Sequence, residues 1–208
     1  MIENLPIYIS LLFGGTVIGT IAWFYFATRS RKFLIFSISW TLLQSILGLN
    51  GVYLDTDALP PKILLFGILP TLVLMLLVFL IPKGKAFIDR INLKTLTYFN
   101  TIRIPVEIVL TLLFHQGLVS VYMTVEGTNF DLFSGLTAGI VAYVAFSNGL
   151  VKKKLLLGWH VVCFLLLLNV VITAVFALPS PFQKLSLTQP NVAVLYFPFN
   201  LLPSVVVP

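Results

Sequence analysis

Long apolar runs separated by short polar connectors dominate the chain. A helix needs about 20 predominantly apolar residues to cross the hydrocarbon core of a bilayer. Runs of this kind predict seven transmembrane helices, at residues 7–27, 33–54, 63–82, within 96–125, 132–150, 155–178 and 191–208. The pattern therefore predicts an all-α fold in which residues 1–208 form a single transmembrane helical domain.

Composition places the chain in the same class. Hydrophobic residues make up 59% of the sequence, charged residues only 10%, and the mean hydropathy is +1.04. A soluble domain of this size needs far more polar side chains to cover its surface. The first apolar run lacks a basic segment before it and a small-residue cleavage site after it, so we expect it to remain as a helix.

The charges of the connectors alternate in sign. Basic residues cluster after the first, third and fifth spans: Arg29, Arg31, Lys32, Lys83, Lys85, Arg90, Lys94, Lys152, Lys153 and Lys154. The opposite connectors carry most of the acidic residues: Glu3, Asp55, Asp57, Glu126 and Asp131. Because cytoplasmic loops are enriched in lysine and arginine, we expect the N-terminus outside and the basic loops in the cytoplasm.

The basic loops account for the net charge of +6, so nucleic acid is not an expected partner. The expected partners are the lipid bilayer and, at the cytoplasmic face, anionic lipid. Residues 84–101 alternate apolar and charged side chains at helical spacing. This segment is interpreted either as a short helix on the inner membrane surface, before the fourth span, or as a solvated basic loop.

Two opposite charges, Arg103 and Glu107, interrupt the apolar stretch 96–125 that contains the fourth span. An ionisable residue in the hydrocarbon region indicates a functional site, whereas one at the interface does not. If the helix covered residues 96–116, both charges would lie deep in the membrane. Residues 118–125 would then form an apolar connector in water, which is unfavourable.

The sequence instead favours a fourth span over residues 105–125. Pro105 disfavours helix at the preceding residue but is tolerated in the first turn of a new helix, where its missing N–H is not needed. Gly127 then follows as a C-terminal cap, and the next connector is short. This frame predicts Glu107 in the first turn, near the positive end of the helix dipole, with Arg103 as its partner at the interface.

The same frame moves a polar pair, His115 and Gln116, toward the middle of the membrane. Thr111 and Ser120 share their side of the helix at helical spacing. In the second span, Gln44 lies on a small and polar face with three residues: Ser37, Thr41 and Gly48. These faces predict a polar cavity or hydrogen-bond network between the second and fourth spans. The alternative is that the polar groups only hold helices together, at about 0.6 kcal/mol each.

The turn after the fourth span carries Glu126, Asn129 and Asp131. These groups suit an outward-facing ion or ligand site. Capping is the alternative, because Asn129 is a favoured N-cap residue and negative charge at Asp131 suits the first turn of a helix.

Metal and cofactor chemistry is not predicted. The two histidines, His115 and His160, lie on different spans at different depths, and a zinc site needs three or four ligands. The seventh span contains no lysine for a retinal Schiff base. Enzymatic activity is not favoured, because no nucleophile, base and orienting residue share one depth.

Two segments, Arg103-Ile-Pro-Val-Glu107 and Met123-Thr-Val-Glu-Gly-Thr-Asn-Phe-Asp131, carry a resemblance to a family. Here the chain resembles a group of uncharacterised, small multi-pass membrane proteins of bacteria. The similarity covers the fourth and fifth spans and extends to Gln189-Pro-Asn191 and Phe197-Pro-Phe199. The resemblance implies a bacterial inner (plasma) membrane location and no particular activity.

Two functions remain from this reasoning. The first is a carrier or channel for a small molecule or ion, favoured slightly by prolines that interrupt the third and seventh spans. Its ligand or ion path candidates are Arg103, Glu107, His115, Gln116, Gln44, Glu126, Asn129 and Asp131. The alternative is a non-catalytic membrane sensor, binding module or assembly partner, in which the same residues join helices.

Overall fold

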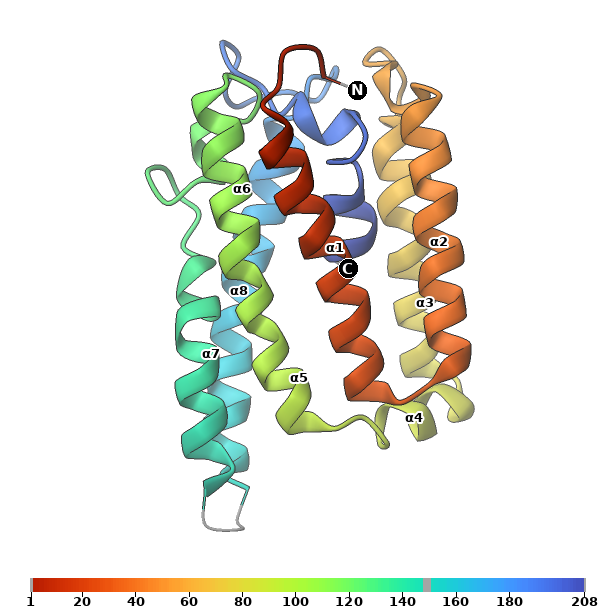
Figure 1. Cartoon of the computed structure of the whole chain (residues 1–208), viewed down its shortest axis with the longest axis vertical. Helices are drawn as coiled ribbons and strands as arrows, with labels where there is room; N and C mark the ends of the chain where they lie inside the picture. Colours follow the sequence, from red (N-terminus) through yellow and green to blue (C-terminus); the bar gives the residue numbers. More distant parts are fainter. Residues whose placement is uncertain (1, 148–150, 208) are drawn as a thin grey trace. The chain divides into compact units, whose positions relative to one another are not determined.

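The computed structural model describes residues 2–147 and 151–207, which form helices and turns with no β-strand among them. Within this part of the chain, five helices are long and apolar enough to cross a membrane (Figure 1). They are α1 (Ile7–Thr28), α2 (Arg31–Leu49), a helix over Ile63–Leu80, a helix over Leu93–His115, and α8 (Lys153–Phe176). These helices fit a multi-pass membrane protein.

The chain folds as two compact units. Unit 1 contains the described residues up to Asn92, together with 179–181 and the segment from Val192 onward. Unit 2 contains Leu93–Leu178, apart from residues 148–150, and Phe182–Asn191. That the whole chain acts as one transmembrane domain stays a prediction.

In unit 1, a tight connection joins α1 to α2. Arg29 takes the left-handed conformation, with φ of 53°, and its N–H donates to the Tyr25 carbonyl at 2.7 Å, which ends α1. Ser30 then caps α2, because its hydroxyl accepts from the Phe33 N–H at 3.2 Å. The bounds of α1 match the predicted first span. The second span is shorter than predicted, because α2 ends at Leu49 and a 3₁₀ turn, η1 (Val52–Leu54), follows.

The third span begins as a π-helical turn, η2 (Ile63–Ile68), and continues as α3 (Leu69–Leu80). Pro70 lies in the first turn of α3 and has no N–H. The carbonyl of Phe66, four residues earlier, therefore lacks its ordinary α-helical donor. No residue of α3 is buried within the chain, as expected for a helix that faces lipid.

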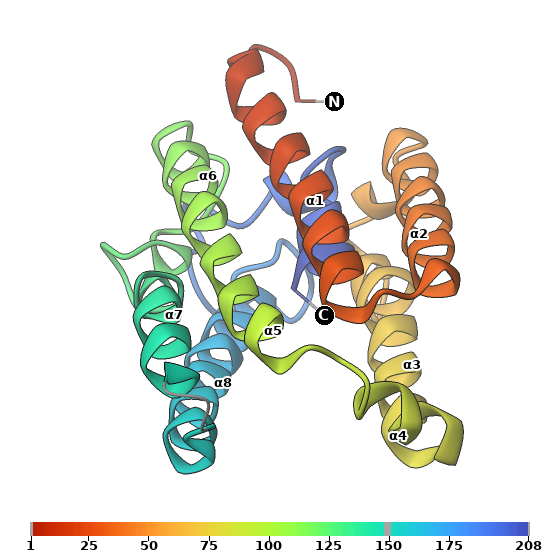
Figure 2. The ribbon, with the colours of Figure 1, turned by 60° about the horizontal axis from the view of Figure 1, so that its bottom comes forward.

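The predicted seventh span, residues 191–208, is wrong as a continuous helix over the residues that the structure describes. Residues 192–207 contain only two short helical turns, η6 (Ala193–Leu195) and η7 (Leu202–Val206). Pro198 and Pro203 remove backbone donors and interrupt the helix. The segment is nevertheless largely buried, because η7 contacts α1, α2 and η2. The centroid of the Phe199 ring lies 5.3 Å from that of Phe13 on α1. Figure 2 shows this C-terminal segment, in dark blue, behind α1.

In unit 2, one nearly continuous helix covers Leu93–His115 as α5 (Leu93–Phe99), a 3₁₀ turn η3 (Asn100–Ile102) and α6 (Arg103–His115). The predicted start of the fourth span at Pro105 is therefore wrong. Pro105 does lie in the first turn of α6, where a missing N–H is tolerated, but helical residues also precede it. The 3₁₀ turn lets the chain continue past the proline, and Arg103 falls at the middle of the helix.

The apolar connector after α6 is buried rather than in water. Val119 and Met123 are 1% and 4% exposed. Residues far along the chain supply the missing hydrogen bonds: the Gln189 amide donates to the carbonyls of Phe114 and Val119 at 2.9 and 2.7 Å. Asn191 Oδ1 accepts from the Ser120 N–H at 2.9 Å. This burial removes the objection to the helix frame that ends near residue 116.

A shorter apolar helix, α7 (Leu132–Ala145), packs against the long helix and α8. Gly135 permits the close approach, since a Cβ there would lie 2.9 Å from Ile104 Cγ1. The Trp159 indole N–H donates to Thr137 Oγ1 at 2.9 Å and joins α8 to α7. The last three residues of the predicted fifth span, 148–150, lie outside the described residues.

The segment predicted to lie on the inner membrane surface is divided between two elements. A short helix, α4 (Pro82–Ile88), begins at its N-terminal end in unit 1. Its later residues, from Leu93, belong to the long helix of unit 2. A single interfacial helix over residues 84–101 is therefore wrong.

Candidate functional site

An ion pair lies at the middle of the long helix in unit 2. The Arg103 guanidinium pairs with the carboxylate of Asp131, the residue directly before α7, and the two side chains are 17% and 8% exposed. Ser134 adds a hydroxyl donor to Asp131 at 3.3 Å. The close contact of α7 with the long helix brings the two charges together. The arginine's partner is thus Asp131, not Glu107 as the sequence predicts.

Glu107 lies one turn beyond Arg103 on α6 and is 4% exposed. Its Oε1 accepts a hydrogen bond from the Asn129 amide at 2.6 Å. Its Oε2 is buried and has no hydrogen-bond partner among the described residues. One oxygen of this carboxyl group is therefore available to a ligand, and a buried carboxylate oxygen without a partner is costly.

Asn129 is held rigidly between these groups. Its amide nitrogen also donates to the Met123 carbonyl at 2.9 Å, and its Oδ1 accepts from the Asp131 N–H at 2.9 Å. The side chain therefore orients the Glu107 carboxyl group and the turn that presents Asp131 at the same time. The bond from the Asp131 N–H, two residues after Asn129, is of the kind that a helix cap makes, whereas capping does not account for the bond to Glu107.

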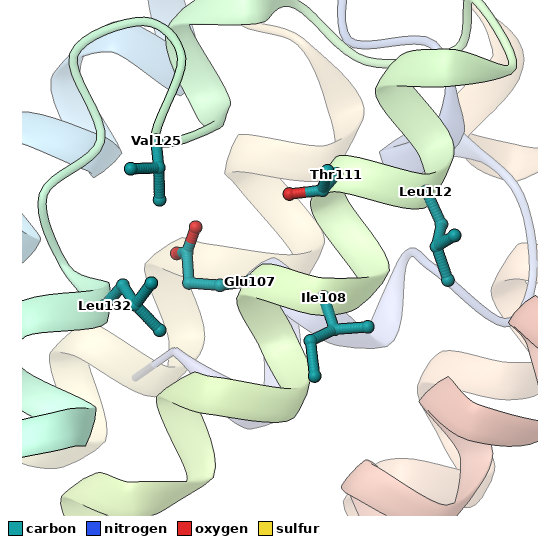
Figure 3. A pocket seen from close by; sticks show the side chains of 6 residues that line it. All are labelled: Glu107, Ile108, Thr111, Leu112, Val125 and Leu132. Atoms are coloured by element: carbon teal, nitrogen blue, oxygen red, sulfur yellow. The ribbon is translucent and has the colours of Figure 1, made fainter.

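A pocket of about 220 Å³ lies beside the Glu107 side chain. Six residues line it: Glu107, Ile108, Thr111, Leu112, Val125 and Leu132. Figure 3 shows the Glu107 carboxyl group directed between Val125 and Leu132, with the Thr111 hydroxyl facing the same space. The pocket thus combines one carboxyl group and one hydroxyl with apolar walls.

The charges of this cluster do not cancel when both acids are ionised. Arg103 and Asp131 neutralise each other, which leaves the charge of Glu107 uncompensated. A buried charge needs a partner or must be neutralised. The arrangement therefore suits one bound monovalent cation or one proton at Glu107.

A second polar cluster lies in unit 1, around Gln44 on α2. The Gln44 amide donates to the Phe66 carbonyl at 3.0 Å, and its oxygen accepts from the Tyr53 hydroxyl at 2.5 Å. Asn200 donates to the backbone carbonyl of Gln44 at 2.8 Å. Asn200 Oδ1 packs so closely on Gly48 that a Cβ there would lie 2.6 Å away. Asn200 Oδ1 is itself buried and has no hydrogen-bond partner among the described residues.

The structure brings four of the eight predicted site residues together: Arg103, Glu107, Asn129 and Asp131. Glu126 lies near them in sequence but is exposed. His115 and Gln116 lie at the exposed C-terminal end of α6, so their predicted place at mid-helix is wrong. Gln44 belongs to the cluster of unit 1, and its hydrogen bonds go to the third span and η1 rather than to the fourth span.

Sequence reasoning missed several residues that complete these clusters. Ser134 was overlooked because a serine in an apolar helix signals little on its own. Asn191 and Asn200 are both buried, and each was hidden inside what reads as a spanning helix. An amide in an apolar run, flanked by prolines, is the local signal that could have identified them as partners for backbone groups.

Comparisons with protein-family models, with curated proteins and with solved structures found no match to this chain. Among the described residues, no group of three or more histidine, cysteine, aspartate or glutamate side chains is arranged to hold a metal ion. The functional conclusion therefore depends on the site itself.

Proposed function

We propose that this protein is a multi-pass carrier in a bacterial inner membrane that binds a small monovalent cation at Glu107. In this proposal the N-terminus lies outside and the basic connectors lie in the cytoplasm. The basic residues after α1, around α4 and before α8 support this orientation, because all three groups fall on one side when the first four long helices alternate in direction and the shorter α7 returns the chain to that side before α8.

The observation that carries the proposal is the free oxygen of Glu107. It is buried, it belongs to a side chain that lines a pocket, and the charge of that side chain exceeds what the Arg103–Asp131 ion pair can neutralise. Ionisable groups placed in this way within an apolar helix mark ion and substrate paths in membrane proteins. The amide of Asn129 fixes the carboxyl group in one orientation, which prepares it for a ligand.

The alternative is a non-catalytic binding, sensing or assembly module. It is favoured by the hydrogen bonds of Asp131 and Asn129, which join the long helix, the connector and the start of α7. In that function Glu107 would serve cohesion only, and no cation would cross the membrane.

Flux measurements in proteoliposomes separate the two. Wild-type protein is compared with Glu107→Gln, which keeps an oxygen to accept from Asn129 but removes the charge. Glu3→Gln makes the same substitution at an exposed position and serves as the control. We expect flux of protons, alkali ions or small ammonium ions in the wild type and the control, and a loss of at least tenfold in Glu107→Gln. Equal flux in wild type and Glu107→Gln, or none in either, would refute the carrier.

A further inference from the structure

The rim of the Glu107 pocket indicates which cation it takes. Ile108 and Val125 line the pocket and are still 48% and 45% exposed. Ile108 lies on α6, where an exposed apolar side chain of a membrane helix faces lipid rather than water, and Val125 lies in the turn that follows η4. The pocket therefore opens between apolar side chains, and Glu107 is its only charged lining residue.

An inorganic cation fits this pocket poorly. It would lose its hydration shell and receive in exchange two oxygen-bearing side chains, from Glu107 and Thr111, while the other four lining residues offer only methyl and methylene groups. Hard cations need six or more oxygen ligands or retained water. An alkylammonium ion needs less, because its three N–H donors meet the two oxygens and its alkyl chain covers the apolar walls.

We propose that Glu107 binds the ammonium group of a short, lipophilic primary amine, which reaches the pocket from the bilayer. This inference rests on the proposed function and specifies its ligand. The volume of about 220 Å³ holds roughly seven non-hydrogen atoms at about 30 Å³ each, which corresponds to a nitrogen and a chain of about six carbons. It is smaller than the pockets that hold drug-sized ligands.

A free amine suits the pocket better than the ammonium group of a lipid headgroup. In phosphatidylethanolamine, a phosphate lies two carbons from the nitrogen and would need a positive partner close to Glu107. The nearby Arg103 is already paired with Asp131. A phosphate would then be buried without compensation, which is costly.

Equilibrium dialysis tests the inference on the full chain in phosphatidylcholine nanodiscs, with binding to empty nanodiscs subtracted. The probes are methyl-, butyl- and hexylammonium, potassium ion, and 1-hexanol as the uncharged analogue. Each added methylene is worth about 0.8 kcal/mol, so we expect affinity to rise about fourfold per methylene up to hexylammonium. Glu107→Gln should bind every amine with at least tenfold lower affinity than the wild type, and Glu3→Gln should bind with unchanged affinity. The uncharged 1-hexanol should show no saturable binding.

A second variant tests the alkyl part of the site. Val125→Phe fills the pocket from a half-exposed position, where the fold tolerates a larger side chain. This substitution should lower the affinity for hexylammonium at least tenfold and change the affinity for methylammonium by less than twofold. If Val125→Phe weakens the binding of hexylammonium and methylammonium by the same factor, the alkyl chain of the amine does not occupy the pocket and the inference is wrong.

The remaining outcomes separate this inference from the proposed function. If potassium or methylammonium binds as tightly as hexylammonium, and this binding requires Glu107, the lipophilic amine is refuted while the cation site stands. If no cation binds in a manner that requires Glu107, both are refuted. If hexylammonium binding disappears in nanodiscs that contain phosphatidylethanolamine, the lipid headgroup is the occupant and the free amine is wrong.

Discussion

Replacing Gln44 by leucine is expected to destabilise unit 1 by about 1–3 kcal/mol. Leucine has a similar size and fits a helix, so the main loss is two hydrogen bonds, to the Phe66 carbonyl at 3.0 Å and from the Tyr53 hydroxyl. Interhelical hydrogen bonds in membrane proteins average about 0.6 kcal/mol and reach about 1.7 kcal/mol. The fully buried position of Gln44 and the loss at Pro70 of the ordinary α-helical donor to Phe66 favour the upper part of that range.

Pro70 explains why Phe66 depends on Gln44, and it supplies the decisive comparison. In Pro70→Ala, the new N–H lies four residues after Phe66 and can donate to its carbonyl, as in an ordinary helix. Gln44→Leu should therefore cost about 0.6 kcal/mol less in the Pro70→Ala background than in the wild type.

Unfolding by sodium dodecyl sulfate in mixed micelles, followed by circular dichroism, measures both free-energy differences. Ser45→Ala is the matched control on the same helix, because its hydroxyl donates only to the Thr41 carbonyl one turn earlier. We expect Ser45→Ala to lower the free energy of unfolding by less than about 0.5 kcal/mol. Equal costs of Gln44→Leu in the two backgrounds would show that the glutamine does not replace the N–H that proline lacks.

Three further predictions concern charges. Asp131→Asn breaks the ion pair with Arg103 and leaves Glu107, one turn along α6, as the nearby negative charge, so it should cost about 1.5–3 kcal/mol in the same assay. No measurable loss would contradict the ion pair. A hydrogen bond from Lys62, whose Nζ lies 2.7 Å from Asp55 Oδ2, and the charge of Lys62 hold the pKa of Asp55 below its usual range. Lys62→Met should therefore raise that pKa in carboxyl NMR titrations. An unchanged pKa would contradict the contact. The orientation is tested with single-cysteine variants in a Cys163→Ser background. The thiol of Lys153→Cys should react with a membrane-impermeant label only from the cytoplasmic side, and that of Asp57→Cys only from outside. Reversed labelling would overturn the orientation.

The apolar pattern predicts the helices whose ends carry their own signals. The bounds of α1 and α8 lie within two residues of the predicted spans. A proline or a basic residue marks each of these ends, Pro6 and Arg29 for α1 and Lys152 and Pro179 for α8, and such local signals can be read from sequence. The seventh span was wrong because its composition is apolar enough for a membrane helix, whereas prolines and the buried Asn200 give it an irregular, protein-covered course.

The fourth span shows where local rules stop being sufficient. Pro105 was interpreted as a helix start, and the apolar connector after residue 116 was expected to avoid water. Pro105 does lie in a first helical turn and the connector does avoid water, but by another route, because Gln189 and Asn191 hydrogen-bond the connector from 70 or more positions away. Sequence reasoning named Arg103, Glu107 and the later acidic turn among its candidates, but it placed the first two at a helix end and favoured His115 with Gln116. It could not pair them, because the pairing follows from how α7 returns along the long helix.

The buried connector also has a consequence for biosynthesis. The Ser120 N–H and the Val119 carbonyl are satisfied by Asn191 and Gln189, and the connector they stabilise carries Val125 to the pocket and Asn129 to Glu107. During translation, the long helix can enter the bilayer well before these residues leave the ribosome. The site around the Glu107 carboxyl group is therefore incomplete until residues 189–191, more than 80 positions later, have also been synthesised.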